Sequence, residues 1–517
     1  MEFIELADYP LPGGHVVEWL PTAASHWADW PRDTRAVSHN HEQHLRDALE
    51  HNRIRERRHY WLGHAFRLDG ALDAAAWRIA LDQWIDRHEA LRTHVTVEGG
   101  RPARYTAEPG VIRVRPVDAG THASTMATFR LVQDLLDEGT SPLRWPSYVC
   151  VTIDGRRGCT VVLAADHSIM DGYSTTGIGG ELRALYESAR AGTAPALPAP
   201  GSYVDFSERE RAVAATVTAD DPGVALWREF LSSTANSDEA DRTPVLSVVD
   251  PAPAAPDYAR NGLRAEPASA NGLAVLPGDD PFGRVAARPV AVGAPAPEAT
   301  QRTLALELLD SRAADAAAAL AREHGQSLFA VLLAAFAATT AEFGAGRDFR
   351  TVVPLHTRSE PCWAETLGWF VGLAPFALDT GGARTLAELV GPAGAELRRV
   401  RGAARVPFRH VCDVLEVRPR IAFMVSYMDI RAVPGAHAWA DSETRWLRSR
   451  NRSGEEFFFW FLRTPSGVSL NMRYPGTTRA TRDIHRHVLR MRELLTEFAV
   501  RGDVPVRPVE GAPLSWR

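Results

Sequence analysis

A long stretch without regular hydrophobic spacing, from about residue 234 to 300, constrains the fold more than any other feature of this sequence. It is rich in Ala, Pro, Gly and Asp and contains the segments DPAPAAP and VGAPAPEAT. This composition is typical of a linker or a long surface crossover. We therefore expect an N-terminal half over residues 1–233 and a C-terminal half over 301–517, joined by the connection at 234–300.

The spacing of apolar residues predicts that both halves mix strands with helices. In the first half, residues 60–70 alternate as a half-buried strand, and Asp73 is placed to cap the helix that follows. In the second half, residues 304–308 alternate as a strand, and two apolar helices follow over 311–324 and 327–343. The predicted fold class is therefore α/β or α+β.

Charge and composition exclude several classes of function. The chain has 64 acidic and 58 basic residues, a net charge of −6, and such a mildly acidic protein is a poor candidate for binding nucleic acid. All the basic residues are arginine, which excludes a Schiff-base lysine, a Ser–Lys dyad and a P-loop lysine. The four cysteines show no C-x-x-C spacing and are too few for a disulfide scaffold.

Two segments bear on where the protein resides. The opening MEFIELADYP is acidic and carries no apolar signal core. The most apolar stretch, Leu328 to Ala338, is shorter than the roughly 20 residues that a membrane span needs. We therefore expect a soluble, cytoplasmic protein without a membrane span.

The loop from Asp166 to Gly172, DHSIMDG, is the segment most suggestive of chemistry. It follows a continuous apolar strand over 159–165, so the sheet would fix the backbone of His167. Histidine can accept and return a proton near neutral pH. Asp171 can anchor the loop if an arginine meets it. A core histidine beside a solvated aspartate is equally compatible with this local sequence.

The loop resembles the H-H-x-x-x-D-G motif of the condensation-domain superfamily, which includes chloramphenicol acetyltransferase, nonribosomal-peptide condensation domains and polyketide-associated acyltransferases. Other segments are similar to motifs of that superfamily: PGGHVVEWLP, RHEALRT, YVDF, LGWFVGLAPF, SYMDIRAVPG and RYPGTTRA. Only the stretch at about 234–300 shows no match. The subgroup that these segments resemble most is the polyketide-associated acyltransferases of actinobacteria.

The resemblance implies two chloramphenicol-acetyltransferase-like halves in a V-shaped pseudo-dimer with a central tunnel. His167 matches the catalytic histidine, which would remove a proton from an acceptor as it attacks an acyl thioester, without a covalent acyl-enzyme. Asp171 and Gly172 match positions that support the loop, and Arg358 matches the arginine that pairs with the aspartate. The tunnel is expected to be lined by residues including Trp369, Phe370 and Ser426, although core packing explains the aromatic residues equally well.

The sequence departs from the family pattern in two places. Asp166 stands where the first histidine of the motif is usual; that position mainly supports structure, so we expect activity to be retained. A carboxylate there would raise the pKa of His167 if it lay within reach. Gly372 and Leu373 replace the Asn-Thr of peptide condensation domains, which favours a stand-alone acyltransferase over an enzyme that forms peptide bonds.

Three other motifs have simpler interpretations. The two histidines of His41-Glu42-Gln43-His44 are three positions apart rather than four, so we expect a polar surface helix and no metal site. Ser174 does not lie in a nucleophile elbow and is expected to cap a helix. Two groups of arginines are candidates for coenzyme A phosphates or an acidic carrier protein, with solvated surfaces as the favoured interpretation: Arg53, Arg55, Arg57 and Arg58, and Arg398, Arg399, Arg401, Arg405 and Arg409.

The leading hypothesis is an acyltransferase that moves an acyl group from a thioester to an alcohol, giving an ester in lipid or secondary-metabolite biosynthesis. The donor would be acyl-coenzyme A or an acyl carrier protein, and no metal or bound cofactor is required. One alternative is an amide-forming enzyme with an amine acceptor. Another is a non-catalytic module that docks a carrier protein. Two halves in one chain can build the site, so we expect a monomer.

Overall fold

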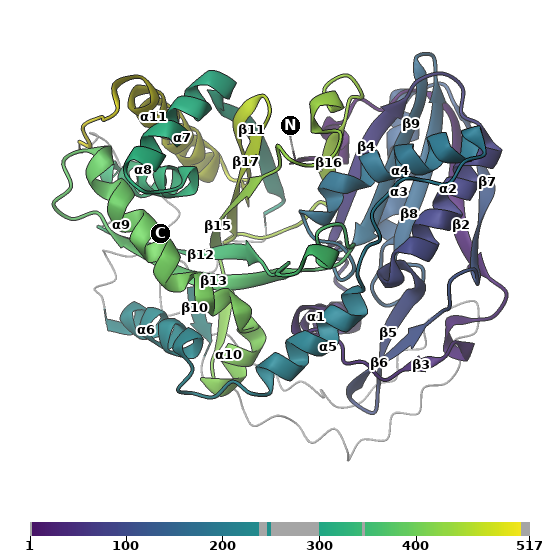
Figure 1. Cartoon of the computed structure of the whole chain (residues 1–517), viewed down its shortest axis with the longest axis horizontal. Helices are drawn as coiled ribbons and strands as arrows, with labels where there is room; N and C mark the ends of the chain where they lie inside the picture. Colours follow the sequence, from purple (N-terminus) through teal and green to yellow (C-terminus); the bar gives the residue numbers. More distant parts are fainter. Residues whose placement is uncertain (1–2, 237–245, 250–298, 344–346, 508–517) are drawn as a thin grey trace.

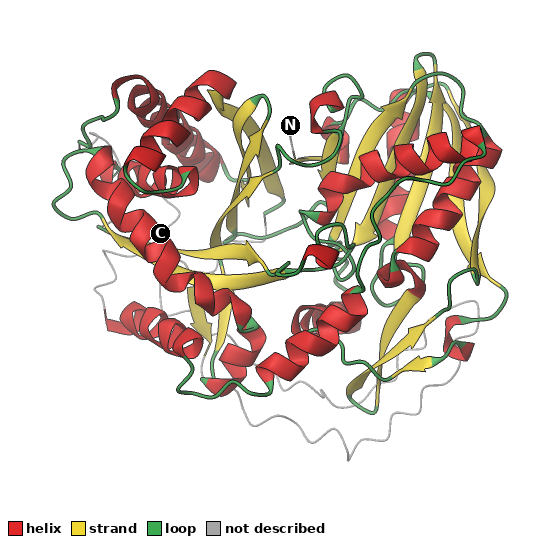
Figure 2. Cartoon of the chain, in the orientation of Figure 1, coloured by secondary structure: helices red, strands yellow, loops and turns green. Residues whose placement is uncertain are grey.

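The computed structural model describes residues 3–236, 246–249, 299–343 and 347–507. Two halves that each combine a β-sheet with helices lie side by side (Figure 1). Figure 2 shows the strands of each half gathered into a sheet that helices cover. The mixed α/β fold predicted from the sequence is thereby confirmed. The linker predicted at 234–300 falls mainly on residues 250–298, which lie outside the described residues.

The first half is built on a seven-stranded sheet in the order β1-β16-β4-β9-β8-β2-β7. Helices α2 and α4 pack on one face, and α3 packs on the other. The bounds of the strands, in sheet order, are Phe3–Glu5, Arg445–Arg448, Trp61–Leu68, Gly158–Asp166, Tyr148–Gly155, Gly14–Ala23 and Ile112–His122. The helices span Ala74–Arg87 for α2, Thr125–Gly139 for α3 and Ser174–Ala191 for α4.

Strand β9 lies near the middle of this sheet and is buried on both faces. Val161 and Leu163 point into the core beneath α2 and α4, whereas Val162 and Ala164 point into the core beneath α3. This explains the unbroken apolar run in the sequence, because a strand covered on both sides has no polar face. The strand ends at Asp166, so the loop that follows starts from a rigid position.

A smaller unit at one end of the first half carries helix α1, His39–Arg53, and helix α5, Tyr203–Ala214. Its three-stranded sheet has the order β3-β6-β5, and the bounds of these strands are Arg32–Asp33, Arg101–Thr106 and Thr93–Glu98. Ser38 caps α1 by accepting a hydrogen bond from the N–H of His41, and its hydroxyl also lies 3.0 Å from the Tyr203 hydroxyl. Helix α1 is thus fixed against α5.

The second half contains a six-stranded sheet in the order β11-β18-β17-β15-β12-β13. These strands span Gln301–Asp310, Gly467–Pro475, Phe457–Thr464, Phe423–Asp429, Asp348–His356 and Val371–Asp379. Its helices α7, α8, α9, α10 and α11 span Ser311–Glu323, Leu328–Glu342, Leu386–Val400, Phe408–Val414 and Thr478–Arg501.

Helix α8 explains the most apolar stretch of the sequence. Every residue from Leu328 to Thr340 is buried, so the helix is surrounded by protein on all sides. Among the described residues, no individual helix is both long and apolar enough to cross a membrane; only α7 and α8 taken together, bent by 98° at their junction, pass that test of length and composition.

Several segments cross between the halves. Strand β16 follows β15 in the chain, yet it pairs antiparallel with β4 of the first sheet (Figure 1). Helix α6, Pro222–Asn236, packs Val224 and Trp227 into the core of the second half, so the boundary predicted after residue 233 falls inside this helix. Strand β10, Leu246–Val249, pairs with β14, Arg418–Ile421. The two halves are therefore interlocked.

Candidate active site

His167 is the first residue after strand β9, at the side of the first sheet that faces the second half. Its backbone N–H donates to the carbonyl of Tyr60, which precedes β4, at 2.9 Å. The N–H of Asp166 donates to the carbonyl of Ser147, which precedes β8, also at 2.9 Å. The two neighbouring strands thus fix the backbone of the histidine from both sides.

An ion pair between the halves anchors the other end of this loop. Arg358, in the segment that joins β12 to β13, donates from Nη2 to both carboxylate oxygens of Asp171 at 3.0 and 3.2 Å. Its Nη1 donates to the carbonyls of Trp363 and Thr366, each at 2.6 Å. This is the contact that the sequence motifs led us to expect. The guanidinium therefore connects the loop of the first half to the segment between β12 and β13 of the second half.

Ser174 is the first residue of helix α4 and does not cap it, which differs from the sequence-based expectation; the carboxylate of Asp171 accepts its N–H instead. Oδ1 of Asp171 accepts the N–H of Ser174 at 2.7 Å, and Oδ2 accepts the N–H of Phe370 at 2.9 Å. The Ser174 hydroxyl instead donates to the Gly368 carbonyl and accepts from Arg358. Burial raises the pKa of Asp171, but the ion pair and these hydrogen bonds outweigh it, so its pKa lies below the usual value. The carboxylate remains charged.

The imidazole of His167 is clamped on one side and open on the other. The indole of Trp369 packs against it with ring centroids 4.1 Å apart. Nδ1 is buried, whereas the residue as a whole is partly exposed, so the accessible nitrogen is Nε2. Burial and the nearby His44 lower the pKa of His167 to about 4. The ring is therefore neutral near pH 7 and ready to accept a proton.

Asp166 contacts a residue that the sequence interpretation placed at the surface. His44 Nε2 lies 3.0 Å from Asp166 Oδ2, and the N–H of Ser168 donates to Oδ1 at 2.9 Å. His41 and His44 are both buried, so the expectation of a polar surface helix is wrong on this face of α1. The signal in the sequence was the loop itself: an aspartate that ends a buried strand needs a polar partner.

The expected effect of Asp166 on the pKa of His167 is present but is outweighed. The carboxylate does act to raise the pKa of His167, but burial of the ring and the proximity of His44 lower it by more. Asp166 is committed to His44 and to a backbone N–H. These partners largely compensate the charge of Asp166, so its effect on the pKa of His167 is weakened.

The three residues expected to line a tunnel have different environments. Trp369 contacts His167, as described above. Phe370 is fully buried beneath the guanidinium of Arg358, whose Cζ lies 4.2 Å from the ring centroid, so it supports the loop and does not line a channel. Ser426 lies on β15 two residues before Met428, whose Cε would lie 3.7 Å from a Cβ on Gly172. Because side chains alternate along a strand, Ser426 is on the face directed at the loop, and its place in a tunnel stays a prediction.

Gly372 has a structural reason to be glycine. A Cβ at this position of β13 would lie 1.9 Å from the carbonyl oxygen of Ala404. Ala404 belongs to a short 3-10 helix, Arg401–Arg405, that packs directly against the strand. An asparagine at residue 372, as in peptide condensation domains, is incompatible with this packing.

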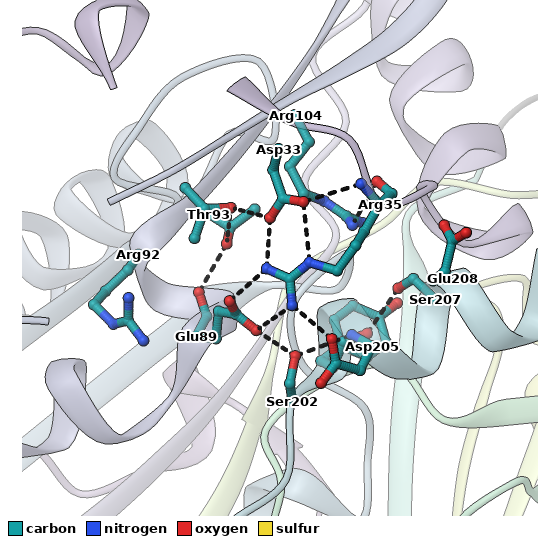
Figure 3. Close-up of polar contacts among 12 residues, drawn as sticks. Asp33, Arg35, Glu89, Arg92, Thr93, Arg104, Ser202, Asp205, Ser207 and Glu208 are labelled. Carbon is teal, nitrogen blue, oxygen red and sulfur yellow. Dashed lines mark hydrogen bonds and ion pairs between the residues drawn. The ribbon is translucent and has the colours of Figure 1, made fainter. Parts of the chain in front are cut away.

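Arg35 gathers two of the sequence motifs around one guanidinium (Figure 3). It donates to Asp33, to Glu89 of the segment RHEALRT, and to Asp205 of the segment YVDF, with shortest distances of 2.6, 2.7 and 2.6 Å. Glu89 also accepts a hydrogen bond from Ser202, the cap of α5. These motif residues therefore fix the start of α1 and α5 rather than contact His167.

Five of the nine arginines in the two groups form ion pairs or hydrogen bonds with other side chains. Arg53 pairs with Glu50 and Arg58 with Glu56, and in the second group the partners are Gln326 for Arg398, Glu396 and Glu229 for Arg399, and Asp413 for Arg409. Binding of phosphates or of a carrier protein by either group stays a prediction. Across the described ranges, no three histidine, cysteine or acidic side chains gather in a way that would hold a metal ion.

Comparisons with known proteins agree with the fold described above. The sequence model described as "Condensation domain" matches residues 49–237 and 289–509. "Acyltransferase PapA3" of Mycobacterium tuberculosis is 21% identical over 520 residues, covering 96% of each chain. The solved structure "PapA2 acyl transferase" superposes with a TM-score of 0.79 at 18% identity, covering 96% of this chain and 100% of that one. The first condensation domain of the calcium-dependent antibiotic synthetase, at 16% identity, gives 0.63 over 93% and 99%.

Proposed function

The chain belongs to the condensation-domain family and is an acyltransferase, and we propose that it transfers an acyl group from a thioester to an alcohol. The product is an ester in lipid or secondary-metabolite biosynthesis, and the acyl donor is acyl-coenzyme A or an acyl carrier protein. One observation carries this proposal: an uncharged, partly exposed His167 is held rigidly between the two halves with Nε2 on the open side.

His167 acts first as a general base. Nε2 takes the proton of the acceptor hydroxyl as the oxygen attacks the thioester carbonyl, and the carbonyl oxygen becomes negatively charged. When the tetrahedral intermediate collapses, the C–S bond breaks and the new ester bond remains. The imidazolium then returns its proton to the departing thiolate, giving a free thiol. No covalent acyl-enzyme forms in this series of steps.

The other site residues support this chemistry without reacting. Asp171 and Arg358 hold the loop so that Nε2 keeps its position during the proton transfer. The negative oxygen of the intermediate needs a hydrogen-bond donor, and we assign this role to a backbone N–H near Gly172. Trp369 packs against the ring of His167 and limits its rotation.

The proposal is tested by measuring release of free thiol with a panel of acyl-coenzyme A and acyl-carrier-protein donors, combined with simple alcohols and amines. We expect release that depends on an alcohol and falls about 10²–10⁴-fold in His167→Ala, the usual contribution of general acid–base catalysis. Circular dichroism of both proteins checks folding. A matched control is His15→Ala, a partly exposed histidine on β2, which should retain full turnover.

Each other outcome favours a specific alternative. Release that depends only on amines would replace the ester by an amide product. Full activity in a folded His167→Ala variant would remove the histidine from the mechanism. Absence of release with every donor, including acyl carrier proteins, would favour the non-catalytic docking module.

A further inference from the structure

His44 reaches from α1 into the site behind the catalytic loop. Its Nε2 lies 3.0 Å from Asp166 Oδ2, and only 8% of the residue is exposed. Its ring also packs edge-on against the indole of Trp369, with centroids 5.8 Å apart. The same indole packs against the ring of His167, with the ring centroids 4.1 Å apart. His44 is therefore linked to His167 twice, through Asp166 and through Trp369.

Asp166 needs His44 because its carboxylate is almost completely buried. An isolated charge at such a position costs several kcal/mol unless it is paired and hydrogen-bonded. Oδ1 is satisfied by the N–H of Ser168, and in the described part of the chain His44 is the basic side chain that pairs with Oδ2. An imidazolium at His44 completes the compensation of this carboxylate.

Helix α1 is held firmly enough to present His44 at one place. Its cap, Ser38, contacts the Tyr203 hydroxyl, and the Asn40 side chain donates to the carbonyl of Val371 on β13 at 2.8 Å. The segment before the helix is fixed by the Arg35 contacts with Glu89 and Asp205 (Figure 3). The helix thus contacts both halves, and these contacts fix its position beside the loop.

We propose that His44 is a positioning residue for His167: bound to Asp166, it supplies a buried positive charge beside the catalytic imidazole and braces Trp369 against it. The proposal rests on the proposed role of His167 as general base. This role would explain why Asp166 stands at the first motif position. The family motif has a histidine in the loop at that position, whereas here the aspartate binds a histidine of α1.

The charge of His44 favours the neutral form of His167. The titratable groups that face His167 are Asp166 and Asp171 on its own loop and His44 on α1. Those that face His44 are Asp166, Asp47, the buried His41 and, through ring contact, Tyr60. Burial lowers the pKa of His44, but the charge and hydrogen bond of Asp166 together with the charge of Asp47 outweigh it, so the pKa of His44 lies above the usual value. A second imidazolium at His167 is then opposed by like charge.

The test follows the protonation of His167 directly, by NMR of protein labelled with ¹³C in the histidine rings. The signal of His167 is identified among the 18 histidines as the one missing from His167→Ala. In the wild type this signal should not titrate above about pH 5, one unit above its pKa of about 4. In His44→Gln, which keeps a donor for Asp166 but no charge, the midpoint should move to higher pH.

Two further variants separate charge from structure. Asp166→Asn removes the counter-ion of His44, so both charges are lost, and its midpoint should lie between those of the wild type and His44→Gln. His51→Gln is the matched control, because His51 is on the same helix and contacts Tyr60 but not Asp166. In His51→Gln the signal of His167 should titrate with the same midpoint as in the wild type. At pH 6, kcat/KM of His44→Gln should fall by up to about fourfold, the loss expected if the pKa of His167 rises to its ordinary value of about 6.5.

An unchanged or lower midpoint in folded His44→Gln and Asp166→Asn would overturn the proposal, as would an equal shift in His51→Gln. If His44→Gln does not fold, Asp166→Asn decides by the same midpoint. Failure of the proposed function gives a different pattern: His167→Ala would retain turnover while the NMR midpoints still moved as described.

Discussion

At the scale of single residues, Arg358 shows how one side chain organises the site. Its Nη2 contacts Asp171 and the Ser174 hydroxyl, and its Nη1 contacts the carbonyls of Trp363 and Thr366. The planar guanidinium is the basic group that can serve these directions at once, whereas an ammonium is a point charge. The loss of this residue would leave Asp171 charged and buried without a basic partner.

We therefore expect Arg358→Met to lower the free energy of unfolding by about 3–5 kcal/mol, the usual result of removing one partner of a buried ion pair. Urea denaturation followed by tryptophan fluorescence measures the change. The carboxyl pKa of Asp171 is lowered in the folded state, so the pair stabilises above about pH 3.9, the unfolded value, and is lost only as the pH falls through the folded value. In Arg358→Met the pKa of Asp171 rises, because the guanidinium no longer offsets burial, so the difference between the two proteins should be largest near pH 8 and shrink as the pH falls through that raised value.

Arg55→Met provides the matched control, since Arg55 is exposed at the end of α1. Its free energy of unfolding should stay within about 0.5 kcal/mol of the wild type. A loss of less than about 1 kcal/mol in Arg358→Met would mean that the buried pair contributes little net stability.

At the scale of elements, close packing between β13 and the 3-10 helix at Arg401–Arg405 depends on one glycine. A Cβ added to Gly372 would lie only 1.9 Å from the carbonyl oxygen of Ala404. The atom in the way is backbone, so it cannot rotate aside as a flexible side chain would. Since β13 follows the segment that carries Arg358, this packing also fixes the segment on which the catalytic loop rests.

Gly372→Ala should accordingly destabilise the protein by about 1–3 kcal/mol, the usual cost of overpacking a core. Gly402→Ala, in the same 3-10 helix, is the control, because nothing lies within 4 Å of the Cβ it would add. We expect the control to change the unfolding free energy by less than about 0.5 kcal/mol. Thermal and urea unfolding measure the change in unfolding free energy of each variant. Equal destabilisation of Gly372→Ala and Gly402→Ala would refute the packing argument.

At the scale of the whole molecule, the protein buries several histidines in a neutral form. Burial is the main cause that lowers the pKa of each, to about 3 for His41, His64 and His487 and to about 4 for His94 and His167. In the unfolded chain each would bind a proton below about pH 6.5. The unfolded state thus takes up more protons than the folded state between about pH 6.5 and pH 4.

Stability should therefore be complete above about pH 7 and decline as the pH falls through the unfolded histidine value. From pH 7 to pH 5.5 the expected loss is on the order of 1 kcal/mol for each buried neutral histidine. Denaturation curves at a series of pH values measure the slope. His64→Leu, which removes a fully buried histidine from β4, should reduce that slope by one histidine's share; an unchanged slope would show that the group does not titrate on unfolding.

Much of the fold was predictable because its signals are local. The apolar run at 159–165, the aspartate that caps α2 at residue 73 and the alternation at 304–308 each indicate a strand or helix from neighbouring residues alone. The resemblance to the family motifs likewise indicated His167 and Arg358 as the partner of Asp171, which the local sequence alone left open.

The remaining features were decided by tertiary structure, because they depend on residues far apart in the chain. His44 and Asp166 are 122 positions apart and meet only when α1 packs beside β9. β16 crosses into the first sheet, and Gly372 meets a carbonyl of another element; neither encounter leaves a periodic trace in the sequence. The sequence by itself determined the elements and the reactive loop. The surroundings of His167 depend on tertiary packing, which brings α1 beside the end of β9 and places Arg358 and Trp369 of the second half against the loop.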